Sequence, residues 1–314
     1  MNISEISSQG CWAFVLNQID IEVELPFSFD ENCSIHKATE AQIQKIKQIL
    51  LEKAGGIGFA KPTQFYECDA VMDGASTTLM ALPENEWRYY VVSTSDNGGA
   101  KNNLHMASNI SSAPLEISAL TFYLNTGFGW RSGVLQSHFE RFPVPVKKIG
   151  KDELLETAEV YQSYISFDKE MYPEIPRAMS MFDSLSFLME NSVFHVLGLF
   201  AIIEMLITHN PKLEDRGDSI THQMQSKIPL LSRRFHKPLD YLFHFSGGTE
   251  KKVWSALYKY RSAMAHGGLP DFASSDLRIL KNANNADDFL REVVKSLLRH
   301  SLKEPQLYRD LRNC

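Results

Sequence analysis

The apolar residues of this chain change their spacing once, near residue 147. Before that point they tend to recur at every second position, the period of a half-buried strand; after it they recur about every 3.6 residues, the period of a helix with one buried face. The segment 143–150, Pro-Val-Pro-Val-Lys-Lys-Ile-Gly, separates the two patterns, because its prolines and glycine oppose regular structure. We therefore predict an α+β protein, with a mixed, β-rich domain at 1–146 and an all-α helical bundle at 147–314.

The first domain is predicted to combine strands with few helices. Alternating apolar and polar residues indicate a β-hairpin within 11–30, with its turn at Asn17-Gln18. Thr39 or Glu40 then opens an amphipathic helix. The further expectations are a helix at Ala41–Lys53, strands at Phe65–Met72 and Trp87–Thr94, a polar loop at 96–103, a helix at Leu115–Leu124 and a strand pair within Phe128–Phe142.

The second domain is predicted to be helical throughout. Residues 191–208 are apolar almost all round, so this helix is expected at the centre of the bundle. The last helix has Phe289, Val293, Leu297 and Leu298 on its inward face. The predicted helices are Asp152–Ser166, Asn191–Thr208, Asp218–Phe235, Leu239–Phe245, Glu250–His266 and Ala286–Leu302.

Charge and cysteine usage narrow the class of protein. The net charge of −6 over 314 residues does not suggest a general polyanion binder, yet residues 251–314 carry 12 Lys/Arg against 7 Asp/Glu. The cysteines at 11, 33, 68 and 314 are scattered without metal-binding spacing, and we expect them to be free thiols. No signal peptide is recognised, and the most apolar run, 193–207, is too short to span a bilayer. We expect a soluble cytoplasmic protein.

The chemistry is predicted to lie in the segment 256–268, Ala-Leu-Tyr-Lys-Tyr-Arg-Ser-Ala-Met-Ala-His-Gly-Gly. Arg261 offers a planar, permanently cationic fork that suits a phosphate, and His266 can move a proton near neutral pH. Together they suffice to cleave RNA without a metal. Five positions along an ideal helix amount to a rotation of about 140°. Either the helix unwinds at Ala265-His266, or the site is built across a two-fold interface between two chains.

These residues resemble a known family. Arg261-Ser-Ala-Met-Ala-His266 is similar to the Rx4–6H motif of HEPN domains, and the wider pattern resembles the Apea-like branch of that superfamily over roughly 190–303. In the first half, His36-Lys-Ala-Thr-Glu before a helix is the closest likeness. The matching segments of the second half are 200–206 (Phe-Ala-Ile-Ile-Glu-Met-Leu), 232–235 (Ser-Arg-Arg-Phe), 257–262 (Leu-Tyr-Lys-Tyr-Arg-Ser), His266-Gly267 and the closing amphipathic helix.

The resemblance implies a small helical bundle that forms a homodimer and, as in many members, a metal-independent endoribonuclease of antiviral (anti-phage) defence or toxin systems. Arg261 and His266 would be its catalytic pair, Ser262 the polar residue after the arginine, and Glu204 an acid that orients Arg261. Arg233, Arg234 and Lys259 are the candidate RNA contacts. RNA is the expected partner, with a protein or phage-derived trigger acting at the first domain. No metal or other cofactor and no membrane is expected.

Structural and non-catalytic interpretations of these residues remain open. His266 can simply cap a helix, and Arg261 can pair with Glu204 to hold two helices together. The bundle would then be a non-catalytic dimerisation or interaction module. In a further alternative the basic C-terminal segment docks RNA without cleaving it. His195 and His209 are expected to pack in the core or cap helices, and Arg233-Arg234 can equally be a solvated helix end.

Overall fold

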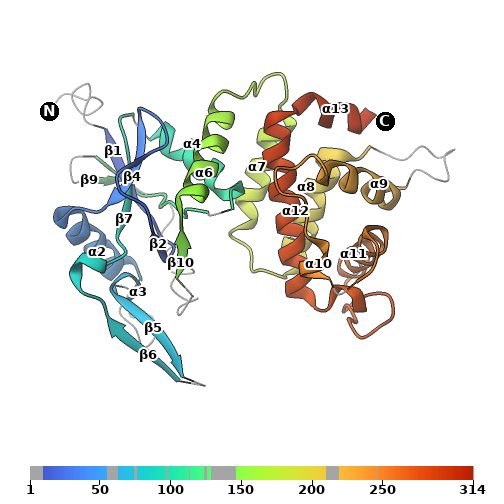
Figure 1. Cartoon of the computed structure of the whole chain (residues 1–314), viewed down its shortest axis with the longest axis horizontal. Helices are drawn as coiled ribbons and strands as arrows, with labels where there is room; N and C mark the ends of the chain where they lie inside the picture. Colours follow the sequence, from blue (N-terminus) through green and yellow to red (C-terminus); the bar gives the residue numbers. More distant parts are fainter. Residues whose placement is uncertain are drawn as a thin grey trace. The chain divides into compact units, whose positions relative to one another are not determined.

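The computed structural model describes residues 10–54, 63–73, 76–96, 98–112, 114–123, 126–128, 146–209, 219–245 and 247–313. A region of β-strands with short helices spans 11–149, and a largely helical part spans 151–313 (Figure 1). The chain divides into two compact units, Met1–Ile165 and Ser166–Cys314. This division lies further along the chain than the predicted boundary near 147, because helix α6 (Lys151–Ile165) packs against helix α4 (Gly99–Ile110) of the first unit.

The first unit is organised around a sheet with the strand order β3-β4-β7-β1-β8-β9, whose neighbouring strands are antiparallel. Two further strand pairs accompany it, the parallel pair β2 and β10 and the antiparallel hairpin of β5 and β6. The strands are β1 (Cys11–Phe14), β2 (Ile19–Ile21), β3 (Phe27–Ser28), β4 (Cys33–Lys37), β5 (Cys68–Asp73), β6 (Ser76–Ala81), β7 (Tyr90–Thr94), β8 (Thr121–Tyr123), β9 (Thr126–Phe128) and β10 (Lys147–Ile149).

Helix α2 (Glu40–Ala54) supplies one side of the core of this unit, and the predicted helix at 41–53 is confirmed. Its start is a capping box, in which the Gln42 amide nitrogen donates to Thr39 Oγ1 and the Thr39 amide donates to Gln42 Oε1. The short elements α3 (Gln64–Glu67) and η1 (Glu84–Glu86) follow. The core cluster contains Phe14, Leu16, Ile46, Ile49, Leu50, Phe65, Tyr66, Tyr89, Val91 and Phe122.

The predicted hairpin within 11–30 is wrong in its pairing. Strand β1 lies between β7 and β8, with Trp12 opposite both Ser93 and Phe122, while β2 pairs with β10. Alternation identifies strands but does not identify their partners. The first residues of the predicted strand at 65–72 form helix α3 instead.

Three further expectations are corrected. The segment predicted as a polar loop at 96–103 contains the start of helix α4, whose first turn is capped by Asp96: Oδ1 accepts from the Gly98 amide and Oδ2 from the Ala100 amide. In place of the helix predicted at 115–124, the described residues 115–123 are extended, with a bridge from Ile117 to Val15 and then strand β8. Most of the predicted strand pair at 128–142 lies outside the described residues, as do residues 143–145 of the linker. The linker was expected to lack regular structure, but its residues Lys147–Ile149 form strand β10.

Three of the predicted free thiols fall within the described residues. Cys11, Cys33 and Cys68 form no disulfide, as expected, and all three are buried; Cys314 lies outside the described part. Burial, with a smaller contribution from Asp30, raises the pKa of the Cys33 thiol to about 12. This thiol is therefore uncharged and unreactive at neutral pH.

Helix α8 is the centre of the second unit, as its composition predicted. Helices α7, α9, α11, α12 and α13 all pack against it. Within the described ranges, no helix combines the length and apolar character that crossing a membrane requires. The helices are α7 (Glu174–Leu185), α8 (Val193–Ile207), α9 (Ile220–Ser232), α10 (Tyr241–His244), α11 (Glu250–Ala265), η2 (Arg278–Leu280), α12 (Ala283–Lys303) and α13 (Pro305–Asn313).

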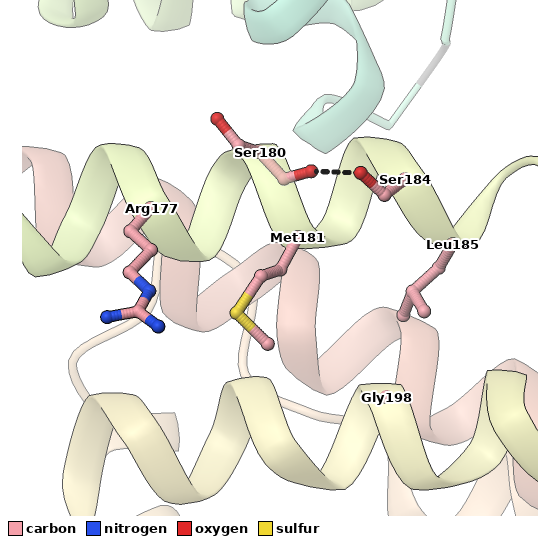
Figure 2. A pocket seen from close by; sticks show the side chains of 6 residues that line it. All are labelled: Arg177, Ser180, Met181, Ser184, Leu185 and Gly198. Carbon is pink, nitrogen blue, oxygen red and sulfur yellow. Dashed lines mark hydrogen bonds between the residues drawn. The ribbon is translucent and has the colours of Figure 1, made fainter.

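Helices α7 and α8 approach closely at Gly198. A Cβ atom at this position would overlap Leu185 Cδ2 and lie 3.2 Å from Leu185 Cδ1. Figure 2 shows Leu185 and Met181 directed from α7 toward the helix that carries Gly198, beside the Arg177 side chain. An open depression of about 350 Å³ lies there, lined by Arg177, Ser180, Met181, Ser184, Leu185 and Gly198.

The close approach predicts an energetic coupling between positions 185 and 198. In the wild-type background, Gly198→Ala forces Leu185 out of its packed position, which opposes the gain of about 1 kcal/mol expected for alanine over glycine inside a helix. In a Leu185→Ala background that overlap is gone. We therefore expect Gly198→Ala to be more favourable there by about 1–3 kcal/mol, measured by denaturant unfolding. Equal effects in both backgrounds would contradict this packing.

Candidate functional site

Helix α11 carries the residues that the sequence singled out. Its N-cap is Thr249, whose Oγ1 accepts from the Lys252 amide at 3.4 Å. One face of the helix is buried against the rest of the unit, while Lys259, Arg261 and Ser262 remain partly or fully accessible. The buried residues are Val253, Trp254, Ala256, Leu257, Tyr260 and Met264.

The helix ends in a Schellman motif. The Gly268 amide donates to the Ala263 carbonyl at 2.9 Å, and the Gly267 amide donates to the Met264 carbonyl at 3.2 Å. Gly267 has φ +71°, a left-handed conformation that glycine adopts without the penalty that a Cβ brings. The two glycines therefore end the helix by a defined hydrogen-bond pattern.

His266 is the C-cap residue of this motif. Its backbone has φ −96° and ψ 11°, and its amide donates to the Ser262 carbonyl at 3.2 Å. The residue is exposed, and among the described residues its imidazole has no hydrogen-bond partner. The helix thus ends at Ala265-His266, one of the two predicted arrangements, and presents an accessible imidazole at its end.

Arg261 forms an ion pair with Glu204 of helix α8. Arg261 Nη2 lies 3.3 Å from Glu204 Oε1, and the two side chains are 30% and 20% exposed. Arg261 Nε and Glu204 Oε1 are buried and make no hydrogen bond within the described residues. The contact is therefore electrostatic without hydrogen-bond geometry, and Glu204 does not use up the donors of the guanidinium.

The surroundings of this pair position Arg261 and shift the pKa of Glu204. Burial raises the pKa of the Glu204 carboxyl above its ordinary value, and the Arg261 guanidinium lowers it in part. On the same helix, the Tyr258 ring lies one turn earlier, with its centroid 5.5 Å from Arg261 Cζ. Arg261 is thus held between a carboxylate and an aromatic ring, with part of its surface left to solvent.

Two of the three candidate RNA contacts are paired with acids. Arg234 Nη2 lies 2.6 Å from Glu304, and Lys259 Nζ lies 2.8 Å from Asp276. Arg233 is exposed at the end of α9, and the described residues contain no ion-pair partner for it. The sequence predicted Arg233 and Arg234 at the end of one helix and Lys259 within another, but it gave no sign of these acidic partners.

Sequence reasoning missed the carboxylate partners of His195 and His244, two buried histidines of the same unit. His195 Nδ1 of α8 lies 2.8 Å from Asp287 Oδ1 of α12, and both side chains are nearly excluded from water. His244 Nε2 lies 2.9 Å from Glu292 Oε2. The available signal was a histidine on an otherwise apolar helix, since a buried polar group requires a partner.

Comparison with known proteins supplies no identity for this site. Protein-family models, curated proteins and solved structures were compared with the chain, and none matches. In the part of the chain that the structure describes, no three His, Cys, Asp or Glu residues gather in a way that could hold a metal ion. Arg261, His266 and their surroundings are therefore the basis for a functional proposal.

The Schellman motif predicts a specific ranking of substitutions at Gly267. A Cβ at this position meets nothing within 4 Å, so the cost of Gly267→Ala is the cost of the left-handed backbone alone, about 1–2 kcal/mol. Gly267→Asn should cost clearly less, because asparagine tolerates this conformation. Denaturant unfolding of the three proteins measures the ranking. Wild-type stability of Gly267→Ala would be inconsistent with the motif.

Proposed function

We propose that this protein is a metal-independent endoribonuclease of the HEPN type. The observation that carries the proposal is the placement of Arg261. It pairs with Glu204 of α8 and lies on helix α11, which ends at the accessible His266. This combines a cation suited to phosphate with a base suited to a hydroxyl group. The resemblance of residues 190–303 to Apea-like HEPN domains supports the same function.

In the proposed reaction His266 acts as the general base. It takes the proton of an RNA 2′-hydroxyl, whose oxygen attacks the adjacent phosphorus while the 5′-oxygen of the next nucleotide leaves with a proton. Arg261 stabilises the negative charge that develops on the phosphate oxygens, and Glu204 and Tyr258 keep its guanidinium in place. Ser262 is the polar residue beside the arginine on the same accessible part of the helix.

The proposed active form is a homodimer. Arg261 faces Glu204 on α8, whereas His266 lies exposed beyond the last helical turn, and no hydrogen bond joins the two side chains in the described structure. A two-fold axis near the end of α11 would bring two such pairs to one cleft. The wider proposal is a role in antiviral defence or a toxin system, with a trigger that acts on the first unit.

The same ion pair favours a second candidate function. A contact between α8 and α11 stabilises the bundle whether or not RNA is present, so the unit can serve as a non-catalytic interaction module. In that case Arg261→Ala leaves the Glu204 carboxylate without its partner and lowers stability by about 1–3 kcal/mol. No catalytic activity would then depend on His266, whose side chain makes no hydrogen bond or ion pair in the described structure.

The endoribonuclease proposal predicts distinct effects of three substitutions on RNA cleavage in the presence of EDTA. His266→Ala and Arg261→Ala should each lower the rate at least about 100-fold, the scale of losing a general base or a charge-stabilising group. His236→Ala, which removes another exposed histidine of the same unit, should cleave at the wild-type rate. Cleavage of a labelled single-stranded RNA, followed on denaturing gels, provides the measurement.

The unfolding transitions of the same variants separate the two candidate functions. Because His266 is exposed, His266→Ala should keep wild-type stability while losing cleavage. Wild-type cleavage by His266→Ala would refute the endoribonuclease proposal. Loss of stability in Arg261→Ala, together with no EDTA-resistant cleavage by the wild type under any trigger, would support the interaction module.

A further inference from the structure

A group of four exposed cations lies at the N-terminal end of helix α11, at the opposite end of this helix from His266. Lys251 and Lys252 belong to its first turn. Arg278 and Lys281 come from the segment around η2, which packs against α11. Ile279 brings that segment to this end, because its Cδ1 lies against Gly248, close to the helix start. We name this group, Lys251, Lys252, Arg278 and Lys281, the basic end of α11.

These four cations are unneutralised in the described structure. None of them has an ion-pair partner there, in contrast to Lys259, which is paired with Asp276. The acid of the same turn is Glu250, so the group with its neighbour carries a net charge of +3. Lys251 and Lys252 also lie at a helix N-terminus, where the helix dipole favours anions and disfavours cations. Folding alone gives no reason for positive charge at this place.

Lys281 has an unusual backbone conformation. Its backbone has φ +66° and ψ −62°, and the Asn282 amide donates to the Leu280 carbonyl at 2.8 Å. These values define a γ-turn of the rare, strained kind, which is costly for a residue with a side chain. Glycine would adopt the turn more easily.

We propose that the basic end of α11 binds the phosphate backbone of RNA at a distance from the cleavage site. The choice of RNA as the anion rests on the proposed function. Helix α11 has 16 residues and is therefore about 24 Å long, so an RNA held at this end reaches His266 several nucleotides further along. The basic end thereby replaces the paired residues Arg234 and Lys259 as the principal contact with the RNA backbone. Short RNAs that cover only the His266 end lack this contact.

The test measures RNA binding by fluorescence polarisation in EDTA at several salt concentrations, with His266→Ala in every protein. The test variant replaces Lys251, Lys252, Arg278 and Lys281 with glutamine. The control replaces four other exposed cations of the helical unit with glutamine, and so changes the net charge as much as the test variant does. These cations are Lys169, Arg177, Lys237 and Lys303. We expect the test variant alone to lose at least tenfold in affinity. The slope of its log affinity against log salt concentration should become shallower by about 3, because each of the four contacts to single-stranded RNA contributes about 0.7.

The variant Lys281→Gly separates the effect of the lysine charge on RNA binding from the effect of the strained backbone on stability. We expect it to bind RNA more weakly while its unfolding midpoint rises, because glycine relieves the γ-turn. Equal RNA binding by the test and control variants would overturn the proposal. It would also be overturned if the test variant kept its RNA binding and lost binding only to anionic phospholipid vesicles or to polyglutamate. Binding is measured without cleavage, so failure of the endoribonuclease proposal and failure of this one give different results.

Discussion

Burial of helix α8 is the constraint on which the helical unit depends. Its 15 residues include two side chains that can carry charge, His195 and Glu204, and each meets a partner from another helix. His195 pairs with Asp287 of α12, and Glu204 pairs with Arg261 of α11. Because a buried charge is costly unless it is paired, these contacts fix how α11 and α12 lie against the apolar helix. The position of Arg261 is thus a consequence of the packing that holds the bundle together.

Much of the helical unit could be predicted from the sequence, whereas the first unit could be predicted only in part. The helix period and the inward positions Phe289, Val293 and Leu297 on α12 are local features, and all three side chains are fully buried. Strand pairing is not local: β1 finds its partners in β7 and β8, far along the chain. Helix α4 was not predicted because its start, with Gly98-Gly99 followed by polar residues, has the composition of a loop, and this start depends on the side chain of Asp96.

In the candidate site, too, local features could be predicted from the sequence, whereas contacts between elements mostly could not. The end of α11 at His266 could be predicted, because Gly267 and Gly268 are a local stop signal, and the Arg261–Glu204 contact was expected from the family resemblance. The acidic partners of Arg234 and Lys259 could not, since Glu304 and Asp276 lie in other elements. The basic end of α11 also depends on tertiary structure, because the segment around η2 must fold back to place Arg278 and Lys281 beside the start of the helix.

The central claim is that His266 activates an RNA 2′-hydroxyl, and one measurement tests it directly. A labelled RNA with a single 2′-deoxynucleotide at its main cleavage position is incubated with the full-length protein in EDTA, beside the unmodified RNA. Cleavage at the modified linkage should stop, and the unmodified RNA should yield a 2′,3′-cyclic phosphate and a 5′-hydroxyl. Unchanged cleavage at the 2′-deoxy linkage, or products that carry a 3′-hydroxyl, would contradict the claim.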